Sequence, residues 1–195
     1  MKHLFLGLAA LSALTLASCN GNAEKKTENT EQASVAKTDS AQVPEKSTEV
    51  KQADFSGLYS HYDHMASALA NDNDKEAAAA AKGILEELPK IETGTFKAEQ
   101  KTTYEDIAAD IKENSEHIAD NVGNIEHQRE HFAILSKDFY DIKKSLAVQK
   151  TLYKVKCPMY NSNKGAIWLS STKEFKNPYL GKAMSTCGKV EEELK

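Results

Sequence analysis

The sequence predicts a mostly α-helical protein, an up-down four-helix bundle followed by a small irregular or β C-terminal segment. Three observations support this fold class. Between residues 53 and 150, apolar residues recur at three- and four-residue spacing, which is typical of helices with one buried face. Short polar links between helical patterns favour antiparallel neighbours. After residue 150, the helical spacing gives way to short apolar runs between turn-forming residues.

The first two predicted helices are separated by the polar link 71–73. Asp74 is expected to cap the second helix, which runs from Lys75 to Leu88, is rich in alanine and stops at Pro89. The apolar face of the first helix consists of Phe55, Leu58, Tyr59, Tyr62, Met65, Ala66 and Leu69.

The third and fourth predicted helices have regular apolar repeats, which are expected to form the bundle core rather than cofactor contacts. Gly123-Asn124 is expected to break the third helix. The third helix repeats every seven residues at Tyr104, Ile111, Ile118 and Ile125, with Ala108 and Val122 interleaved. The fourth alternates three- and four-residue steps through Phe132, Leu135, Phe139, Ile142 and Leu146.

The C-terminal segment is expected to form two short strands, at 152–158 and 165–169. A turn is predicted at 177–181, and residues 184–190 close the domain. The segment contains the single Trp of the chain, two of its three Cys and two of its four Met. Any chemistry is therefore expected to concentrate here.

The composition excludes several functional classes. The 195 residues carry a formal charge of -4, so the chain lacks the basic surface that nucleic-acid binding needs. Six His are too few for a His-rich metal buffer, and three Cys are too few for a disulfide-stapled scaffold. There is no Gly-rich phosphate loop and no convincing Ser-His-Asp order. We therefore predict a protein that is not an enzyme.

The N-terminus has the features of a lipoprotein signal. Residues 1–18 form the predicted signal peptide, with Lys2 before an apolar run too short to span a bilayer. The run ends in Leu16-Ala17-Ser18-Cys19, which resembles the lipobox of bacterial lipoproteins, and that resemblance implies lipidation of Cys19. The alternative is an ordinary signal peptide with an incidental Cys. Asn20, in place of Asp, favours the outer membrane by the enteric sorting rule, so we expect a cell-envelope protein facing the periplasm.

The predicted mature chain has three parts. Residues 19–52 form a lipidated flexible tether, because they carry too little apolar surface to offset the conformational entropy lost on folding. Residues 53–150 form the four-helix bundle. Residues 151–195 form the Cys- and Met-containing segment, which packs on the bundle within the same domain.

The C-terminal motifs resemble an uncharacterised bacterial family. This family is a domain of unknown function that occurs in lipoproteins of the Bacteroidota. It also occurs fused to the C-terminus of periplasmic adaptor proteins of Cus-type copper and silver efflux pumps. The likeness covers roughly residues 53–192, including Gln128-Arg129, Phe132 and Leu135-Ser136. It is carried mainly by Tyr153, Cys157-Pro158-Met159, Asn163-Lys164-Gly165-Ala166, Trp168-Leu169-Ser170, Asn177-Pro178-Tyr179, Gly181, Met184 and Cys187-Gly188.

The resemblance implies a soft-metal site at Cys157, Met159, Met184 and Cys187. Thiolates and thioethers suit Cu(I) or Ag(I), so the predicted function is metal binding or sensing as an accessory to efflux. The expected partners are the membrane, through the lipid, and a heavy-metal efflux adaptor or another envelope protein. The alternative is a structural or interaction module without metal, in which Cys157 and Cys187 form a disulfide. Unpaired buried thiols are a third alternative.

Histidines provide further candidate ligands. His127 and His131 lie four residues apart on one helical face, which suits a zinc or copper site. Solvated or capping histidines are the alternative. His131 is also a candidate addition to the soft-metal set. The segment 127–131 also matches the inverted zinc-protease motif His-x-x-Glu-His, but that chemistry needs a larger catalytic domain. His61, His64 and Met65 form a weaker surface candidate, for which a solvated face is the alternative. Arg129, the single Arg of the chain, is expected either to pair with an acidic group inside the bundle or to be exposed.

Overall fold

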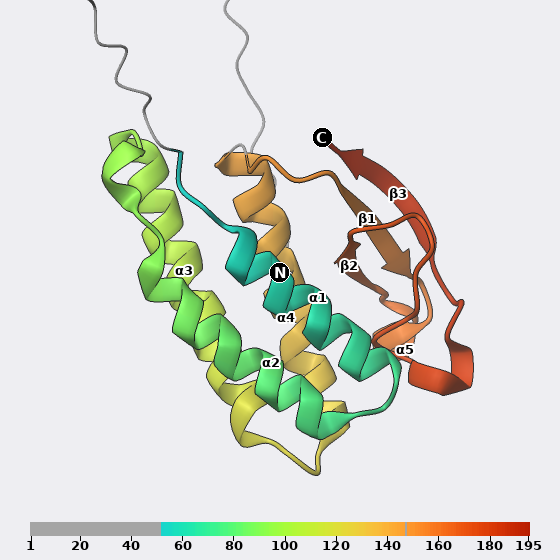
Figure 1. Cartoon of the computed structure of the whole chain (residues 1–195). Helices are drawn as coiled ribbons and strands as arrows, with labels where there is room; N and C mark the ends of the chain where they lie inside the picture. Colours follow the sequence, from blue (N-terminus) through green and yellow to red (C-terminus); the bar gives the residue numbers. More distant parts are fainter. Residues whose placement is uncertain (1–51, 147) are drawn as a thin grey trace, which may run out of the picture. The chain divides into compact units, whose positions relative to one another are not determined.

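The computed structural model describes residues 52–146 and 148–195. The predicted signal peptide, Cys19 and the tether up to residue 51 lie outside the described residues. The main elements follow the predicted order, with four long helices before a small sheet (Figure 1). They are α1 (Ser56–Ala70), α2 (Asp74–Glu87), α3 (Ala98–Asp120), α4 (Ile125–Ser145), β1 (Leu152–Cys157), β2 (Ala166–Ser170) and β3 (Lys189–Leu194). Shorter turns are η1 (Leu88–Lys90), η2 (Thr93–Thr95), α5 (Tyr160–Asn163) and η3 (Gly181–Met184).

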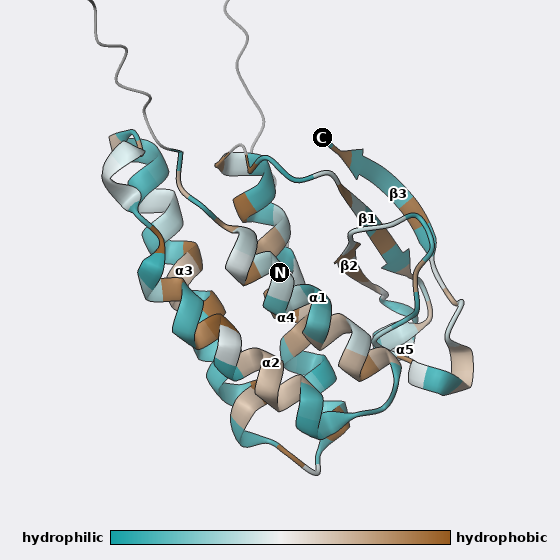
Figure 2. Ribbon diagram, viewed as in Figure 1, coloured by the Kyte–Doolittle hydropathy of each residue, from teal (hydrophilic) through white to brown (hydrophobic). Residues whose placement is uncertain are grey.

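The mostly helical prediction is confirmed, and the helices pack as antiparallel neighbours in chain order. Aromatic side chains fill the space between α1 and α4. The Tyr62 ring centroid lies 5.3 Å from that of Phe132 and 4.5 Å from that of Phe139. Hydrophilic and hydrophobic residues are interspersed along α3, as expected of a helix with one buried face (Figure 2). Among the described residues, no helix is long and apolar enough to cross a membrane.

Two local expectations about the helix ends are wrong. Asn73, not Asp74, caps α2, because its side-chain oxygen accepts a hydrogen bond from the backbone N–H of Glu76 at 3.2 Å. The third helix ends at Asp120, and Val122 is 50% exposed in the link to α4. The last member of the predicted seven-residue repeat, Ile125, therefore begins α4 instead of ending α3.

The C-terminal segment forms a three-stranded antiparallel sheet in the order β2-β1-β3. β1 and β2 match the predicted strands to within a residue or so, whereas β3 was not predicted. Cα partners include Val155 with Trp168 and, on the other edge, Val155 with Val190. Strand β2 lies against α4, and the Trp168 side chain is buried.

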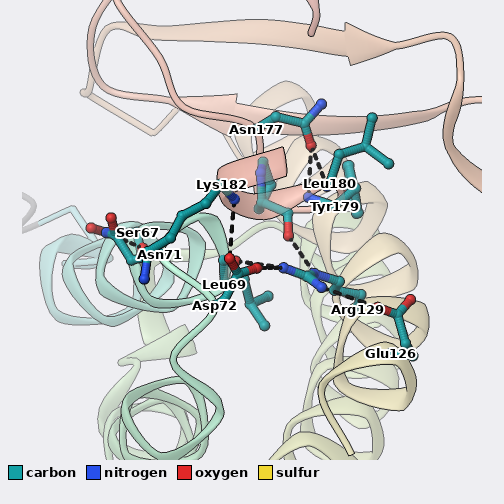
Figure 3. A network of polar contacts seen from close by, with 11 residues as sticks. Ser67, Leu69, Asn71, Asp72, Glu126, Arg129, Asn177, Tyr179, Leu180 and Lys182 are labelled. Atoms are coloured by element: carbon teal, nitrogen blue, oxygen red, sulfur yellow. Dashed lines mark hydrogen bonds and ion pairs between the residues drawn. The ribbon is translucent and has the colours of Figure 1, made fainter. Parts of the chain in front are cut away.

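The buried side chain of Arg129 joins the C-terminal segment to the helices (Figure 3). Its Nε donates to the Pro178 carbonyl at 2.9 Å, and one terminal nitrogen donates to the Leu69 carbonyl at 2.9 Å. The same nitrogen lies 2.6 Å from a carboxylate oxygen of Asp72, and this contact lowers the Asp72 pKa. Arg129 thus pairs with an acidic group, one of the two predicted arrangements, and connects α1, α4 and the C-terminal segment.

Gly181 allows this close approach. Its φ of +55° is in the left-handed region, which favours glycine. A Cβ at this position would overlap the Asp72 carboxylate and come within 2.6 Å of the Arg129 guanidinium. The Asp72 carboxylate also accepts a hydrogen bond from the Lys182 backbone N–H at 3.1 Å. The absence of a side chain at Gly181 therefore lets the turn after Pro178 pack directly against the Asp72–Arg129 ion pair.

Buried hydroxyl groups form a second connection between the layers. The Tyr62 hydroxyl lies 2.8 Å from the Ser136 hydroxyl and accepts a hydrogen bond from the Leu169 backbone N–H at 3.0 Å. The Tyr179 hydroxyl donates to the Ile167 carbonyl. Burial raises the pKa of both tyrosines, so both hydroxyls stay protonated.

The half-buried side chain of Asp138, on α4, is in an environment that disfavours its ionised form. Its Oδ2 has no hydrogen-bond partner among the described residues. Desolvation, reinforced by the charges of Asp110 and Asp141, raises its pKa to about 7. The ionised form of this side chain therefore opposes folding.

We expect Arg129→Met to destabilise the fold by about 2–4 kcal/mol, because it leaves the buried Pro178 carbonyl without its donor and the Asp72 carboxylate without its ion-pair partner. The Leu69 carbonyl loses one of its donors and keeps the hydrogen bond from the Asp72 backbone N–H. Urea unfolding followed by circular dichroism measures this loss. Lys112→Met is the control. It breaks the exposed Lys112–Glu116 pair at 2.6 Å and should change stability by less than about 0.5 kcal/mol. Equal effects of the two substitutions would contradict the role given to Arg129.

We expect Asp138→Asn to stabilise the protein at pH 8 but not at pH 4. A raised carboxyl pKa means that the folded state holds its proton more tightly, so stability falls as pH rises from about 4 through about 7. The full shift corresponds to about 4 kcal/mol, but partial exposure screens the charge, so we expect about 1–2 kcal/mol. Thermal unfolding at both pH values tests this, with exposed Asp106→Asn as the control. A gain at pH 4 equal to that at pH 8 would refute the electrostatic cause.

Candidate functional site

Two groups of candidate metal ligands lie in different layers of the molecule. The first group is the thiol pair, Cys157 and Cys187. Cys157 ends β1 and is fully buried, whereas Cys187 lies just before β3 and is partly exposed. Both are free thiols in the structure, and their Sγ atoms are 3.6 Å apart. Burial, followed by the neighbouring Cys157 thiol, raises the pKa of Cys187.

The backbone around the thiol pair is fixed from two sides. The buried Asn177 side chain donates to the Cys187 carbonyl through its amide nitrogen, and its oxygen accepts from the backbone N–H groups of Tyr179 and Leu180 (Figure 3). Gly188 lets the chain pass closely over Trp168, since a Cβ there would lie 2.8 Å from the indole ring. The Asn177-Pro178-Tyr179 motif thus holds one of the two thiols in place.

The two predicted methionine ligands lie at the surface. Met184 is 41% exposed at the end of η3, and its carbonyl accepts a hydrogen bond from the Cys187 backbone N–H at 3.1 Å. Met159 is 48% exposed and borders a groove of about 720 Å³ beside Ile134 of α4. The structure therefore brings the two thiols together, while both thioethers project from neighbouring turns.

The second group is the histidine cluster, His117, His127 and His131. His117 lies in the last turn of α3, and the other two lie in the first two turns of α4. One ring nitrogen from each histidine lies within 4.8 Å of the others. The rings of His117 and His131 are stacked with centroids 4.2 Å apart, and the His127 ring meets the His131 ring edge-on at 4.6 Å.

His117 is the ligand that sequence reasoning missed. The signal was available, because a four-residue link between antiparallel helices places the last turn of one beside the first turns of the next. His127 and His131 do share one helical face, as expected. Burial, followed by the nearby His117 and His127, lowers the pKa of His131, which favours the neutral, ligating form at neutral pH.

The residues between His127 and His131 have structural roles. The buried Gln128 side chain donates to the carbonyls of Asp74 and Ile118, each at 3.0 Å. Arg129 holds the C-terminal segment, and a Glu130 carboxylate oxygen lies 3.2 Å from His127 Nδ1. The segment 127–131 therefore supplies two candidate metal ligands, and the residues between them make contacts that hold the fold or orient His127.

The weaker candidate on α1 does not assemble. His64 Nε2 lies 3.1 Å from a carboxylate oxygen of Glu76 at the surface, and the His61 ring lies against Gly83 of α2. Met65 is fully buried in the core. The solvated-face alternative for the two histidines is the one that fits these positions.

Comparison with known proteins finds that just under half of the chain matches the model of a family without a known function. Residues 58–151 match the model of a family described as a protein of unknown function, DUF3347. The match runs from α1 through α4, and it supports the expected resemblance to an uncharacterised family. No curated protein and no solved structure matches the chain. The link to Bacteroidota lipoproteins and efflux adaptors stays a prediction.

We expect iodoacetamide to modify Cys187 before Cys157 in the reduced, folded protein, because Cys187 is partly exposed and Cys157 is fully buried. The rate at Cys187 should rise steeply between pH 7 and pH 9, since the thiolate is the nucleophile and the pKa of this thiol is raised. Peptide mass spectrometry of timed samples measures both rates, and denatured protein is the control. Faster labelling of Cys157 in the folded protein would contradict the structure.

Proposed function

We propose that this protein is a lipid-anchored, non-enzymatic cell-envelope protein that binds or senses the soft ions Cu(I) or Ag(I). The observation that carries the proposal is the 3.6 Å separation of the Cys157 and Cys187 sulfurs. Thiolates are the protein ligands that such ions prefer. Cys157 ends β1, and Cys187 lies just before β3, which pairs with β1, so an ion would find both sulfurs already close together.

The spacing indicates the coordination number. With metal–sulfur bonds of about 2.3 Å, sulfurs 3.6 Å apart subtend about 100° at the metal. A linear two-coordinate ion would need them about 4.6 Å apart. The angle therefore favours a third or fourth ligand. Met184, three residues before Cys187 in the same turn, and Met159, two residues after Cys157, are unbranched and exposed enough to fold over the site.

The envelope location rests on the N-terminal sequence. The string Leu16-Ala17-Ser18-Cys19 follows a short apolar run, and residues 19–52 suit a spacer. Lipid attachment at Cys19 would hold the domain at the outer membrane facing the periplasm. The resemblance to domains fused to efflux adaptors supports an accessory role beside such an adaptor.

The same sulfur spacing favours one alternative, an interaction module with a Cys157–Cys187 disulfide. Small side-chain rotations could bring sulfurs 3.6 Å apart to the roughly 2.05 Å of a disulfide. Counting free thiols in protein recovered from an oxidising compartment distinguishes the two. Two free thiols in the described domain favour metal binding, and none favours the module.

We expect loss of the thiol pair to weaken Cu(I) binding by at least about 100-fold, because it removes both soft ligands. Competition titration with a Cu(I) chelator compares the reduced Cys19→Ala chain with its Cys157→Ser/Cys187→Ser form, so the lipidated cysteine is absent from both. Because Cys157 is buried, the single Cys187→Ser chain is measured as well, and circular dichroism checks folding. Equal affinities of the folded proteins would refute the proposal.

A further inference from the structure

We propose that His117, His127 and His131 form a second metal site, which takes a borderline divalent cation such as Zn²⁺ or Cu²⁺ and is independent of the thiol pair. The site joins the C-terminal end of α3 to the N-terminal end of α4. One ring nitrogen from each residue already lies within 4.8 Å of the others.

Neighbouring side chains determine which nitrogen of His131 is free. The Asn114 amide nitrogen donates to the Asp110 carbonyl at 2.8 Å, so the Asn114 oxygen faces the ring and must accept. His131 Nδ1, 2.9 Å from that oxygen, therefore carries the proton. The lone pair on His131 Nε2 remains available for a metal.

His127 is oriented in the same way by a carboxylate. Its Nδ1 lies 3.2 Å from an Oε2 atom of Glu130, and a carboxylate at neutral pH can only accept. The proton is again on Nδ1 and the lone pair on Nε2. A ligating histidine whose other ring nitrogen donates to a carboxylate or a carbonyl oxygen is the usual arrangement around protein-bound metals.

The donor set and the exposure indicate the class of ion. Three neutral imidazoles suit zinc, copper and nickel in the divalent state, whereas soft monovalent ions prefer sulfur. His117 is exposed and the other two rings are partly exposed, so an ion can enter from solvent and keep water in an open fourth position. Such a site exchanges its ion readily, unlike a closed structural site.

Binding requires one rearrangement. Three imidazole nitrogens around a tetrahedral ion, each about 2.0–2.1 Å from it, lie about 3.4 Å apart. His117 and His131 are stacked within 5° of parallel, so their in-plane lone pairs do not converge on one point. The exposed His117 ring must therefore rotate out of the stack, while the hydrogen bonds to Asn114 and Glu130 hold the other two rings.

Co²⁺ titration of the untagged, reduced Cys19→Ala chain tests the site. We expect one ion bound with tetrahedral visible bands and without thiolate charge-transfer absorption, and displaced by Zn²⁺. His117→Gln should weaken binding at least about 100-fold with little effect on folding, because His117 is exposed. Exposed His64→Gln, which removes a histidine outside the cluster, is the matched control and should bind as the parent does.

A second measurement separates the site from the thiol pair. Zn²⁺ should raise the melting temperature of the Cys157→Ser/Cys187→Ser chain, but not that of the same chain carrying His117→Gln in addition. No Co²⁺ binding, thiolate charge transfer at one equivalent, or equal affinity of His117→Gln and the parent would each overturn the proposal. Loss of Cu(I) binding at the thiols would leave these results unchanged, so the two proposals fail separately.

Discussion

The buried guanidinium of Arg129 is the contact on which the arrangement of helices and sheet depends. It donates to a carbonyl at the end of α1 and to the Pro178 carbonyl, so the C-terminal segment cannot leave the bundle without exposing or unpairing this charge. Asn177, next to Pro178, holds the Cys187 carbonyl. Hydrogen bonds from Arg129 and from Asn177, which are joined through the Asn177–Pro178 peptide bond, therefore connect the helices to the backbone of Cys187.

The two proposed metal sites differ in how firmly their ligands are held. Cys157 ends β1 and Cys187 lies just before β3, with its backbone carbonyl bound by Asn177, so the separation of the thiols depends on the backbone. The histidines lie at helix ends, and the exposed His117 ring can rotate. Sulfur and imidazole ligands also select different ions. Copper is the metal whose monovalent state suits the first donor set and whose divalent state suits the second.

The sequence predicts the helices well because their periodicity is strong, and the α4 stripe from Phe132 to Leu146 is buried throughout. Other features depend on tertiary pairing. The predicted seven-residue repeat extends to Ile125, past the end of α3 at Asp120, since a repeat contains no information about where the hairpin turns. Strand β3 is not predicted from the sequence, because the three consecutive acidic residues Glu191, Glu192 and Glu193 obscure the alternation of more and less exposed side chains. The methionines show that closeness in sequence to a cysteine does not bring a side chain inward: Met159 and Met184 are exposed, while the thiols meet through β1–β3 pairing.

One helical turn of α4 carries both the histidine ligands and the scaffold. The period that places His127 and His131 on the side facing His117 places Gln128 and Arg129 on buried sides. Gln128 satisfies the Ile118 carbonyl at the end of α3, which bears His117, and Arg129 holds the C-terminal segment. The geometry of the histidine cluster thus depends on the contacts that fix α4 within the fold. The third ligand comes from the preceding helix, an arrangement that the string His-x-x-Glu-His does not reveal.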